Sequence, residues 1–159
     1  MIKQLIGALL LWCSLPLQAT PVDLVLTDVD GRSIRTADYR GKWLVLNYWA
    51  TWCPPCLEEI PELVLFHEQH KKDKAVVIGI AMEQITPQRL KQFMEENFMS
   101  YPVVPMVADM PMFGNVSSFP TTYLIDPNGV AVVKHVGAVT ADAIEQFINS
   151  YVPAMSAAR

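Results

Sequence analysis

Runs of apolar residues alternate along the chain with stretches in which apolar and polar residues follow a helical period. Trp43–Trp49 and Ala75–Ala81 are almost continuously apolar, which is typical of strands that are buried on both faces of a sheet. Shorter strands are predicted at Leu24–Thr27, Val103–Val107, Thr121–Ile125 and Val130–Val136, and helices at about 56–71, 86–97 and 140–151. No repeat or linker divides this pattern, so it predicts a single α/β domain.

Turn and cap residues mark the borders between the predicted elements. Asp30 and Gly31 favour a turn in an N-terminal hairpin, and Asp126–Gly129 favours a second hairpin that joins the last two strands. Pro105 has no backbone N–H to donate, which places its strand at an edge of the sheet. Thr140 stands in the N-cap position of the last helix.

The N-terminal segment has a different character. Lys3 precedes the almost wholly apolar run Leu5–Leu15, and Ala19 supplies a small residue after it. This order is typical of a secretory signal, so we expect residues 1–19 to be removed and residues 20–159 to form the mature domain. The alternative is a retained membrane anchor, although the apolar run is about half of the roughly 20 residues that a spanning helix needs.

Composition narrows the possible partners. The sequence is 52% hydrophobic and 18% charged, which is typical of a globular protein with a core. The formal net charge is −4 and basic residues cluster only at Lys71, Lys72 and Lys74, so nucleic acid is not an expected partner. One of the three cysteines, Cys13, lies in the predicted leader. The chemistry is therefore expected at the remaining pair.

That pair forms the motif Cys53-Pro54-Pro55-Cys56 between a predicted strand and a predicted helix. Cysteines three residues apart on a helix are neighbours and can close a disulfide. The first of them meets the free N–H groups and the positive dipole end of the helix, which favour a thiolate. We therefore expect Cys53 to be the nucleophile and Cys56 the resolving thiol, with the two prolines stiffening the first turn.

The segment from Asn47 to Leu63, which reads NYWATWCPPCLEEIPEL, resembles the active-site segment of exported TlpA/ResA-like thioredoxins. Phe119–Asp126, which reads FPTTYLID, is similar to the segment of that family that contains a cis-proline. The resemblance extends over roughly Val22 to Tyr151. It implies a thioredoxin fold, an α/β architecture in which helices flank a central mixed β-sheet, with an N-terminal β-hairpin and an inserted helix–strand element at Thr86 to Val107.

The resemblance also implies roles for individual residues. The proline at position 120 would be cis and lie against the reactive sulfur, and the residue before it would offer backbone groups to an extended substrate. Trp52, directly before the motif, would shape the rim of the site. The expected catalytic residues are Cys53, Cys56 and Glu59, and the expected substrate-binding residues are Trp52, Pro54, Pro55, Phe119 and Pro120.

Glu59 is the candidate proton carrier. Cytosolic thioredoxins have a buried Asp in the strand before the motif, whereas this chain has Asn47, which cannot exchange protons. Glu59 follows Cys56 by three residues, and helical side chains lean toward the N-terminus, so its carboxylate can approach the sulfurs. It matches the acidic position of the exported family. The alternative is a solvated helix residue beside Glu58 and Glu62.

These features predict an exported thiol-disulfide oxidoreductase that uses its own Cys53–Cys56 pair, with no metal and no other cofactor. The resemblance implies a periplasmic or other extracytoplasmic reductant of protein disulfides, such as those in cytochrome c biogenesis or metal-site assembly, recharged by a membrane thiol electron donor. One alternative is a disulfide oxidase or isomerase. Another is a copper-binding chaperone of thioredoxin fold, since Met106, Met110 and Met112 carry soft thioether ligands.

Overall fold

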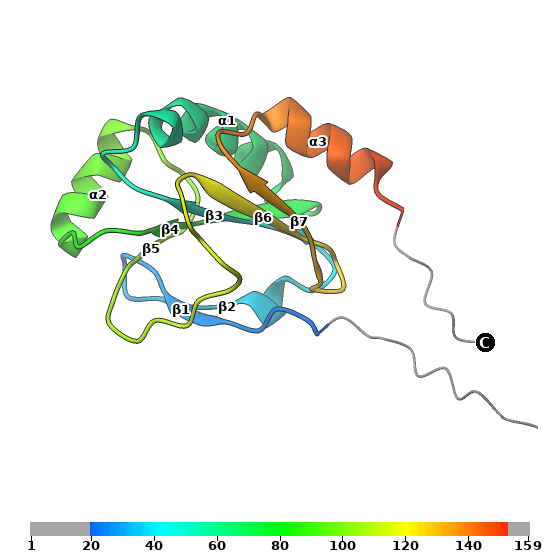
Figure 1. Ribbon diagram of the computed structural model, residues 1–159, viewed down its shortest axis with the longest axis horizontal. Helices are drawn as coiled ribbons and strands as arrows, with labels where there is room; N and C mark the ends of the chain where they lie inside the picture. The colour runs from blue at the N-terminus through cyan, green and yellow to red at the C-terminus, as the bar shows by residue number, and fades with distance from the viewer. Residues whose placement is uncertain (1–19, 153–159) are drawn as a thin grey trace, which may run out of the picture.

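The computed structural model describes residues 20–152 and contains a five-stranded mixed sheet covered on both faces (Figure 1). The sheet order is β5-β4-β3-β6-β7, in which β4 runs parallel to both β3 and β5, and β6 runs antiparallel to both β3 and β7. Its strands are β3 (Trp43–Trp49), β4 (Ala75–Ala81), β5 (Val103–Pro105), β6 (Thr121–Ile125) and β7 (Ala131–Val136). This is the mixed α/β architecture that the sequence predicts.

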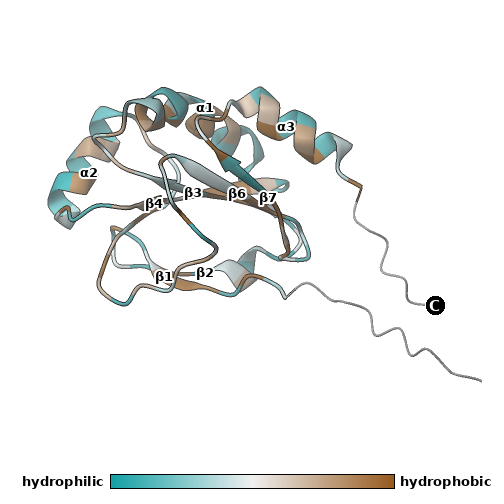
Figure 2. Ribbon diagram, in the orientation of Figure 1, coloured by the Kyte–Doolittle hydropathy of each residue, from teal (hydrophilic) through white to brown (hydrophobic). Residues whose placement is uncertain are grey.

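Three helices cover one face of the sheet. They are α1 (Pro54–His70), α2 (Pro87–Glu96) and α3 (Ala141–Ser150), and all three lie above the sheet in Figure 1. Their apolar sides face the strands and their polar sides face outward, as the colours of Figure 2 show. The resulting core contains Val45 and Trp49 of the central strand together with Ile60 and Leu63 of α1. Every position of β3 is buried, so packing on both faces holds this strand in place and fixes where α1 begins.

The N-terminal hairpin covers the opposite face. It consists of β1 (Val25–Thr27) and β2 (Ser33–Arg35), followed by the short 3-10 helix η1 (Thr36–Tyr39). A long segment after β5 lies on the same face, and two tyrosines of the sheet hold it. The Tyr48 hydroxyl donates to the Phe113 carbonyl at 3.1 Å, and the Tyr123 hydroxyl donates to the Asn115 carbonyl at 2.9 Å. These bonds fix the chain that leads into Phe119 and Pro120.

Helix caps agree with the predicted borders. The Thr140 hydroxyl accepts a hydrogen bond from the Ala143 N–H at 3.2 Å, and the Thr86 hydroxyl accepts one from the Arg89 N–H at 3.3 Å. The edge position predicted for the strand with Pro105 is confirmed, although that strand ends at Pro105 and does not reach Val107.

The predicted leader, residues 1–19, lies outside the described residues. Within residues 20–152, no helix has the length and apolar character needed to cross a membrane.

Candidate functional site

Cys53 and Cys56 form a disulfide at the beginning of α1. Cys53 is the N-cap residue with an extended backbone, and Pro54 and Pro55 fill the first helical positions, where a missing N–H costs little. The Cα atoms of the two cysteines are 5.2 Å apart. The Cys53 residue retains 4% of its surface and Cys56 none, so the first cysteine is the one nearer to solvent.

Apolar residues next to the two cysteines in the chain, together with Phe119, form what we call the apolar rim. It consists of Trp52, Pro54, Pro55, Leu57 and Phe119, of which all but the half-buried Phe119 are exposed. Trp52 keeps 64% of its surface exposed, and its ring meets that of Phe119 edge to face with the ring centroids 6.1 Å apart. The Phe119–Pro120 peptide bond is cis, as the resemblance implied, and Pro120 is buried. Exposed aromatic groups beside a reactive bond are a typical surface for binding another protein.

Glu59 lies on the buried side of α1, one helical turn after Cys56. Only 1% of its surface is exposed, so it is not the solvated helix residue of the alternative interpretation. Asn47 Nδ2 donates to Glu59 Oε1 at 2.8 Å and to Thr122 Oγ1 at 3.0 Å, and the Val139 N–H donates to Glu59 Oε2 at 3.1 Å. We call these four residues, Asn47, Glu59, Thr122 and Val139, the Glu59 network.

The partners of Glu59 are uncharged, and this determines its acidity. Burial raises the pKa of Glu59 from its ordinary value of 4.5 to about 7, and the hydrogen bonds from Asn47 and Val139 offset part of that increase. The carboxyl group can therefore gain and lose a proton near neutral pH. A carboxyl group that titrates near neutral pH is suited to act as a general base.

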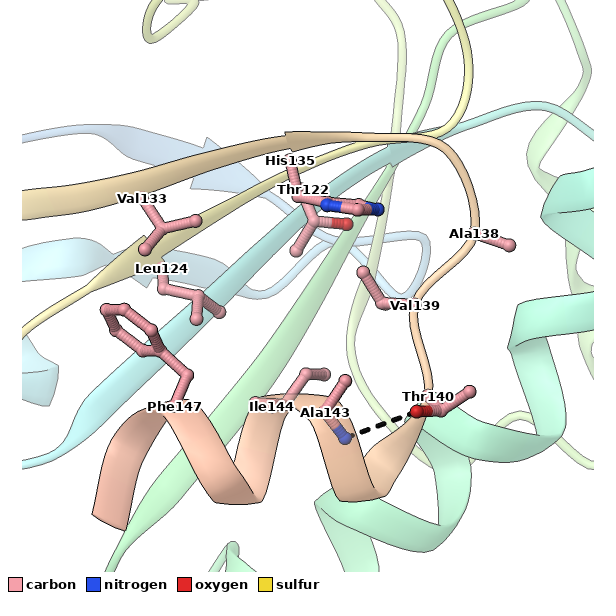
Figure 3. Close-up of a pocket in the computed structure, with 10 residues that line it drawn as sticks. All are labelled: Thr122, Leu124, Val133, His135, Ala138, Val139, Thr140, Ala143, Ile144 and Phe147. Atoms are coloured by element: carbon pink, nitrogen blue, oxygen red, sulfur yellow. Dashed lines mark hydrogen bonds between the residues drawn. The ribbon is translucent and has the colours of Figure 1, made fainter. Parts of the chain in front are cut away.

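A groove of about 350 Å³ borders the Glu59 network between β6, β7 and α3. Thr122 and Val139 both line it, and the side chains of His135 and Phe147 face the same space in Figure 3. His135 is the cross-strand neighbour of Thr122, which places it on the groove that borders the network. The sequence offered no way to place His135 relative to the cysteines.

Histidine, cysteine and carboxylate side chains do not form a metal-binding cluster in the part of the chain that is described. Among residues 20–152, no group of three or more His, Cys, Asp or Glu side chains is placed to hold an ion. His67 is buried and its Nδ1 accepts a hydrogen bond from the Val77 N–H, whereas His70 Nε2 lies 2.8 Å from the Glu145 carboxylate. Of the methionines, Met110 packs against the core under the sheet.

Two further carboxylates have structural partners near the site that the sequence did not indicate. Glu62 Oε2 accepts a hydrogen bond from the Ala141 N–H at 2.9 Å, at the first turn of α3. Glu83 binds Thr51, two residues before Cys53, through both of its carboxylate oxygens. Neither pairing follows a helical or strand period, and the partners are separated by 79 and 32 residues.

Comparison with known proteins agrees with this site. The model of the AhpC/TSA family matches residues 17–135. The thiol-disulfide oxidoreductase ResA of Geobacillus kaustophilus is 34% identical over 136 residues, which are 85% of this chain and 78% of that protein. The thioredoxin-like protein YneN of Bacillus subtilis is 30% identical over 128 residues, which are 80% of this chain and 75% of that protein.

Solved structures show the same fold. A thiol:disulfide interchange protein of the thioredoxin family from Chlorobium tepidum superposes with a TM-score of 0.69 at 25% identity and covers 83% of this chain and 95% of its own. A DsbF homologue from Corynebacterium diphtheriae superposes with a TM-score of 0.74 at 27% identity and covers 84% of this chain and 88% of its own.

A cysteine pair at the start of a helix and a cis-proline, together on a thioredoxin fold, define a thiol-disulfide oxidoreductase. The chain belongs to the AhpC/TSA family, and within it to the oxidoreductases of the ResA type.

Proposed function

We propose that this protein is an exported reductant of disulfides in envelope proteins, with Cys53 as nucleophile, Cys56 as resolving thiol and Glu59 as proton acceptor. The observation that carries the proposal is the buried Glu59 carboxyl with uncharged partners, one helical turn after Cys56. A negative charge there opposes a second negative charge on the cysteine sulfurs. A dithiol whose thiolate is not stabilised is the better reductant, because a stabilised reduced form makes a pair oxidising.

The reaction has two steps. The Cys53 thiolate attacks one sulfur of the substrate disulfide, which joins that sulfur to Cys53 and releases the second substrate sulfur as a thiolate. Cys56 then gives its proton to the Glu59 carboxylate and attacks the Cys53 sulfur. This closes the Cys53–Cys56 disulfide and releases the first substrate sulfur, so two electrons have passed to the substrate.

The apolar rim would hold the substrate during both steps. Trp52, Pro54 and Pro55 present exposed apolar surface next to the two cysteines, and Phe119, which precedes the buried Pro120, meets the ring of Trp52. An extended substrate chain could pair with the backbone at Phe119, next to the sulfurs. The partners that this mode suits are folded or partly folded proteins with an exposed disulfide, including apocytochrome c and metal-site assembly proteins.

The proposal also includes where the protein acts and how its Cys53–Cys56 disulfide is reduced again. The sequence of residues 1–19 supports export, with cleavage after about Ala19 or retention as an anchor. One solved relative that covers 82% of this chain is an exposed lipoprotein thioredoxin of Streptococcus pneumoniae, which supports an extracytoplasmic site of action. Such a compartment is oxidising, so a reductant there needs a membrane thiol electron donor to return Cys53–Cys56 to the dithiol.

A redox titration tests the direction of electron flow. We expect the Cys53–Cys56 pair, equilibrated with dithiothreitol buffers at pH 7, to have a potential near that of thioredoxin, about −270 mV. A value near about −120 mV, which is typical of a strong oxidant, would overturn the proposal in favour of a disulfide oxidase. Stoichiometric binding of Cu⁺ to the reduced protein, lost in Met110→Leu, would instead favour the copper chaperone.

A trapping experiment tests the substrate class. Replacement of Cys56 by Ala removes the resolving thiol, so mixed disulfides with Cys53 should accumulate in the cell envelope. Mass spectrometry of the trapped complexes should identify envelope proteins whose cysteines are normally reduced. The double variant Cys53→Ala/Cys56→Ala is the matched control and should trap nothing. Equal trapping by Cys53→Ala alone would reverse the roles of the two cysteines.

A further inference from the structure

The two parallel strands β3 and β4 separate directly before the active site. They are in register up to the pair Trp49 and Ala81, and the Met82 N–H still donates to the Trp49 carbonyl at 2.8 Å. Beyond this point the ladder between β3 and β4 ends. The chain after β3 turns into α1 and the chain after β4 leads to α2.

One side chain bridges this gap. Glu83 Oε1 accepts a hydrogen bond from the Thr51 N–H at 2.5 Å, and Glu83 Oε2 accepts one from the Thr51 hydroxyl at 3.1 Å. Both carboxylate oxygens are thus engaged by a single residue. Hydrogen bonds to a charged acceptor are stronger than those between neutral groups, and two of them fix both the position and the orientation of Thr51.

Thr51 lies inside the turn that leads into the motif. The Cys53 N–H donates to the Ala50 carbonyl at 3.3 Å and closes this turn, with Thr51 and Trp52 between the two ends. Trp52 is exposed and has one aromatic neighbour, Phe119, so it contributes little packing to hold the turn in place. The grip on Thr51 is therefore the main polar contact that the turn makes outside itself.

We propose that Glu83 is a positioning residue that holds the turn carrying Trp52 and Cys53, and that this grip sets the affinity for protein substrates. The inference rests on the proposed function, since it takes Trp52 as part of the substrate surface. Glu83 acts through Thr51 and touches neither sulfur nor substrate. It fixes the rim relative to β4, while the Glu59 network governs the protons beneath the disulfide.

Hydrogen exchange of the Thr51 amide in the oxidised protein tests the grip itself and needs no substrate. In wild type this N–H is held by the carboxylate, so exchange should be slow. Glu83→Ala should accelerate it by about tenfold or more, because local opening no longer breaks a charged hydrogen bond. Glu83→Gln keeps an oxygen that can accept the Thr51 N–H and should retain most of the protection. Unchanged exchange in Glu83→Ala would overturn the proposal.

Steady-state reduction of two disulfides tests the consequence. One is a synthetic peptide closed by a single disulfide, which can contact the rim, and the other is oxidised glutathione. Glu83→Ala should raise KM for the peptide by about tenfold, which corresponds to one charged hydrogen bond, and leave kcat for both substrates close to that of wild type. Equal losses with both substrates, or a change in kcat alone, would overturn the proposed role.

Matched variants distinguish the effect of the hydrogen bonds between Glu83 and Thr51 from the effect of the negative charge of Glu83. Glu83→Ala and Glu83→Gln remove the same charge, so if they behave alike the effect is electrostatic and the proposal fails. Thr51→Val removes the hydroxyl and keeps the N–H, and it should give a smaller rise in KM. Combined with Glu83→Ala it should add nothing further, because both changes act on one contact. Glu95→Ala, an exposed carboxylate on α2, is the control and should match wild type.

The two assays also distinguish this inference from the proposed function. If wild type reduces neither disulfide, the proposed function fails and the exchange of the Thr51 amide still decides whether Glu83 holds the turn. If wild type reduces both and Glu83→Ala leaves KM for the peptide unchanged, the proposed function stands and the positioning role is overturned.

Discussion

The two sides of the Cys53–Cys56 disulfide are built in opposite ways. In the interior, the Asn47, Glu59 and Thr122 side chains of the Glu59 network are buried and are joined by hydrogen bonds. Around the disulfide, the apolar rim is mostly exposed, and its two aromatic rings, those of Trp52 and Phe119, meet edge to face. The difference suits the two proposed tasks, since proton transfer needs fixed distances and a controlled dielectric, whereas recognition needs surface that a partner can cover.

Helix α1 contains two glutamates, Glu59 and Glu62, whose comparison allows the effect of burial to be measured. Glu59 and Glu62 are three residues apart, and each accepts a backbone N–H from the segment that leads into α3, at 3.1 Å and 2.9 Å. Glu59 is fully buried whereas Glu62 remains half-buried. A difference between Glu59→Gln and Glu62→Gln therefore reports the burial of Glu59 and its position one turn after Cys56, and not the loss of a link to α3.

The largest expected effect is on the resolving step. In the proposed mechanism Glu59 accepts the Cys56 proton only when it is ionised, so in wild type the resolving step should accelerate as pH rises through about 7 and then level off. Glu59→Gln should lose this dependence and be slower by about a hundredfold on the plateau, as for the loss of a general base. Rapid-mixing turnover of a model disulfide from about pH 5 to 9 measures this.

Glu62→Gln should retain the wild-type profile in that assay. If the pH profiles of wild type and Glu59→Gln superimpose, Glu59 takes no part in the proton transfer. The buried network would then have only a structural role.

The free energy of unfolding of the oxidised protein should depend on pH because the Glu59 carboxyl group titrates. The pKa of Glu59 is raised by folding, so the folded state holds the proton more tightly than the unfolded chain. The contribution to stability is therefore full below pH about 4.5 and is lost as pH rises toward about 7. The shift corresponds to a decline of about 3 kcal/mol in the free energy of unfolding across that window.

Urea unfolding of wild type, Glu59→Gln and Glu62→Gln at several pH values checks this prediction. The difference between wild type and Glu59→Gln should shift by about 3 kcal/mol in favour of the variant between pH 4 and pH 8. Other titrating groups are common to both proteins and cancel in the difference. A constant offset at all pH values would mean that Glu59 titrates normally in the folded protein.

The rim and the strands could be read from the sequence because their signals are local. Continuous apolar runs identified β3 and β4, and the spacing of Cys53 and Cys56 before an amphipathic stretch located the disulfide. The cis-proline at position 120 followed from resemblance to exported thioredoxins and is confirmed. The strand with Pro105 is shorter than its apolar pattern suggested, since that pattern continues to Val107 after the ladder with β4 has ended.

The polar contacts could not be read, because they join residues far apart in the chain. Asn47 is recognisable from the sequence as unable to carry a proton, but its hydrogen bonds to Glu59, 12 residues away, and to Thr122, 75 residues away, are not. The same holds for Glu83 and Thr51, which meet only because β3 and β4 are adjacent and end together. Hydropathy fixes which face of an element is buried, but no periodicity marks which buried polar atoms meet.

The smallest expected effect is that of Trp52→Ala in the apolar rim, which should change substrate binding alone. Trp52 is exposed, so Trp52→Ala should change the free energy of unfolding by less than about 0.5 kcal/mol. It should raise KM for a disulfide-closed peptide by about tenfold, as expected when an aromatic anchor is lost, and leave the pH profile of the resolving step unchanged.

Phe98→Ala is the matched control, since Phe98 is an even more exposed aromatic residue beyond the C-terminal end of α2. A rise in KM for Phe98→Ala as large as that for Trp52→Ala would show that any exposed aromatic residue binds the peptide, and that the rim is not a specific surface. An altered pH profile in Trp52→Ala would show instead that the interior and the rim are coupled, because the exposed ring would then be influencing the buried proton.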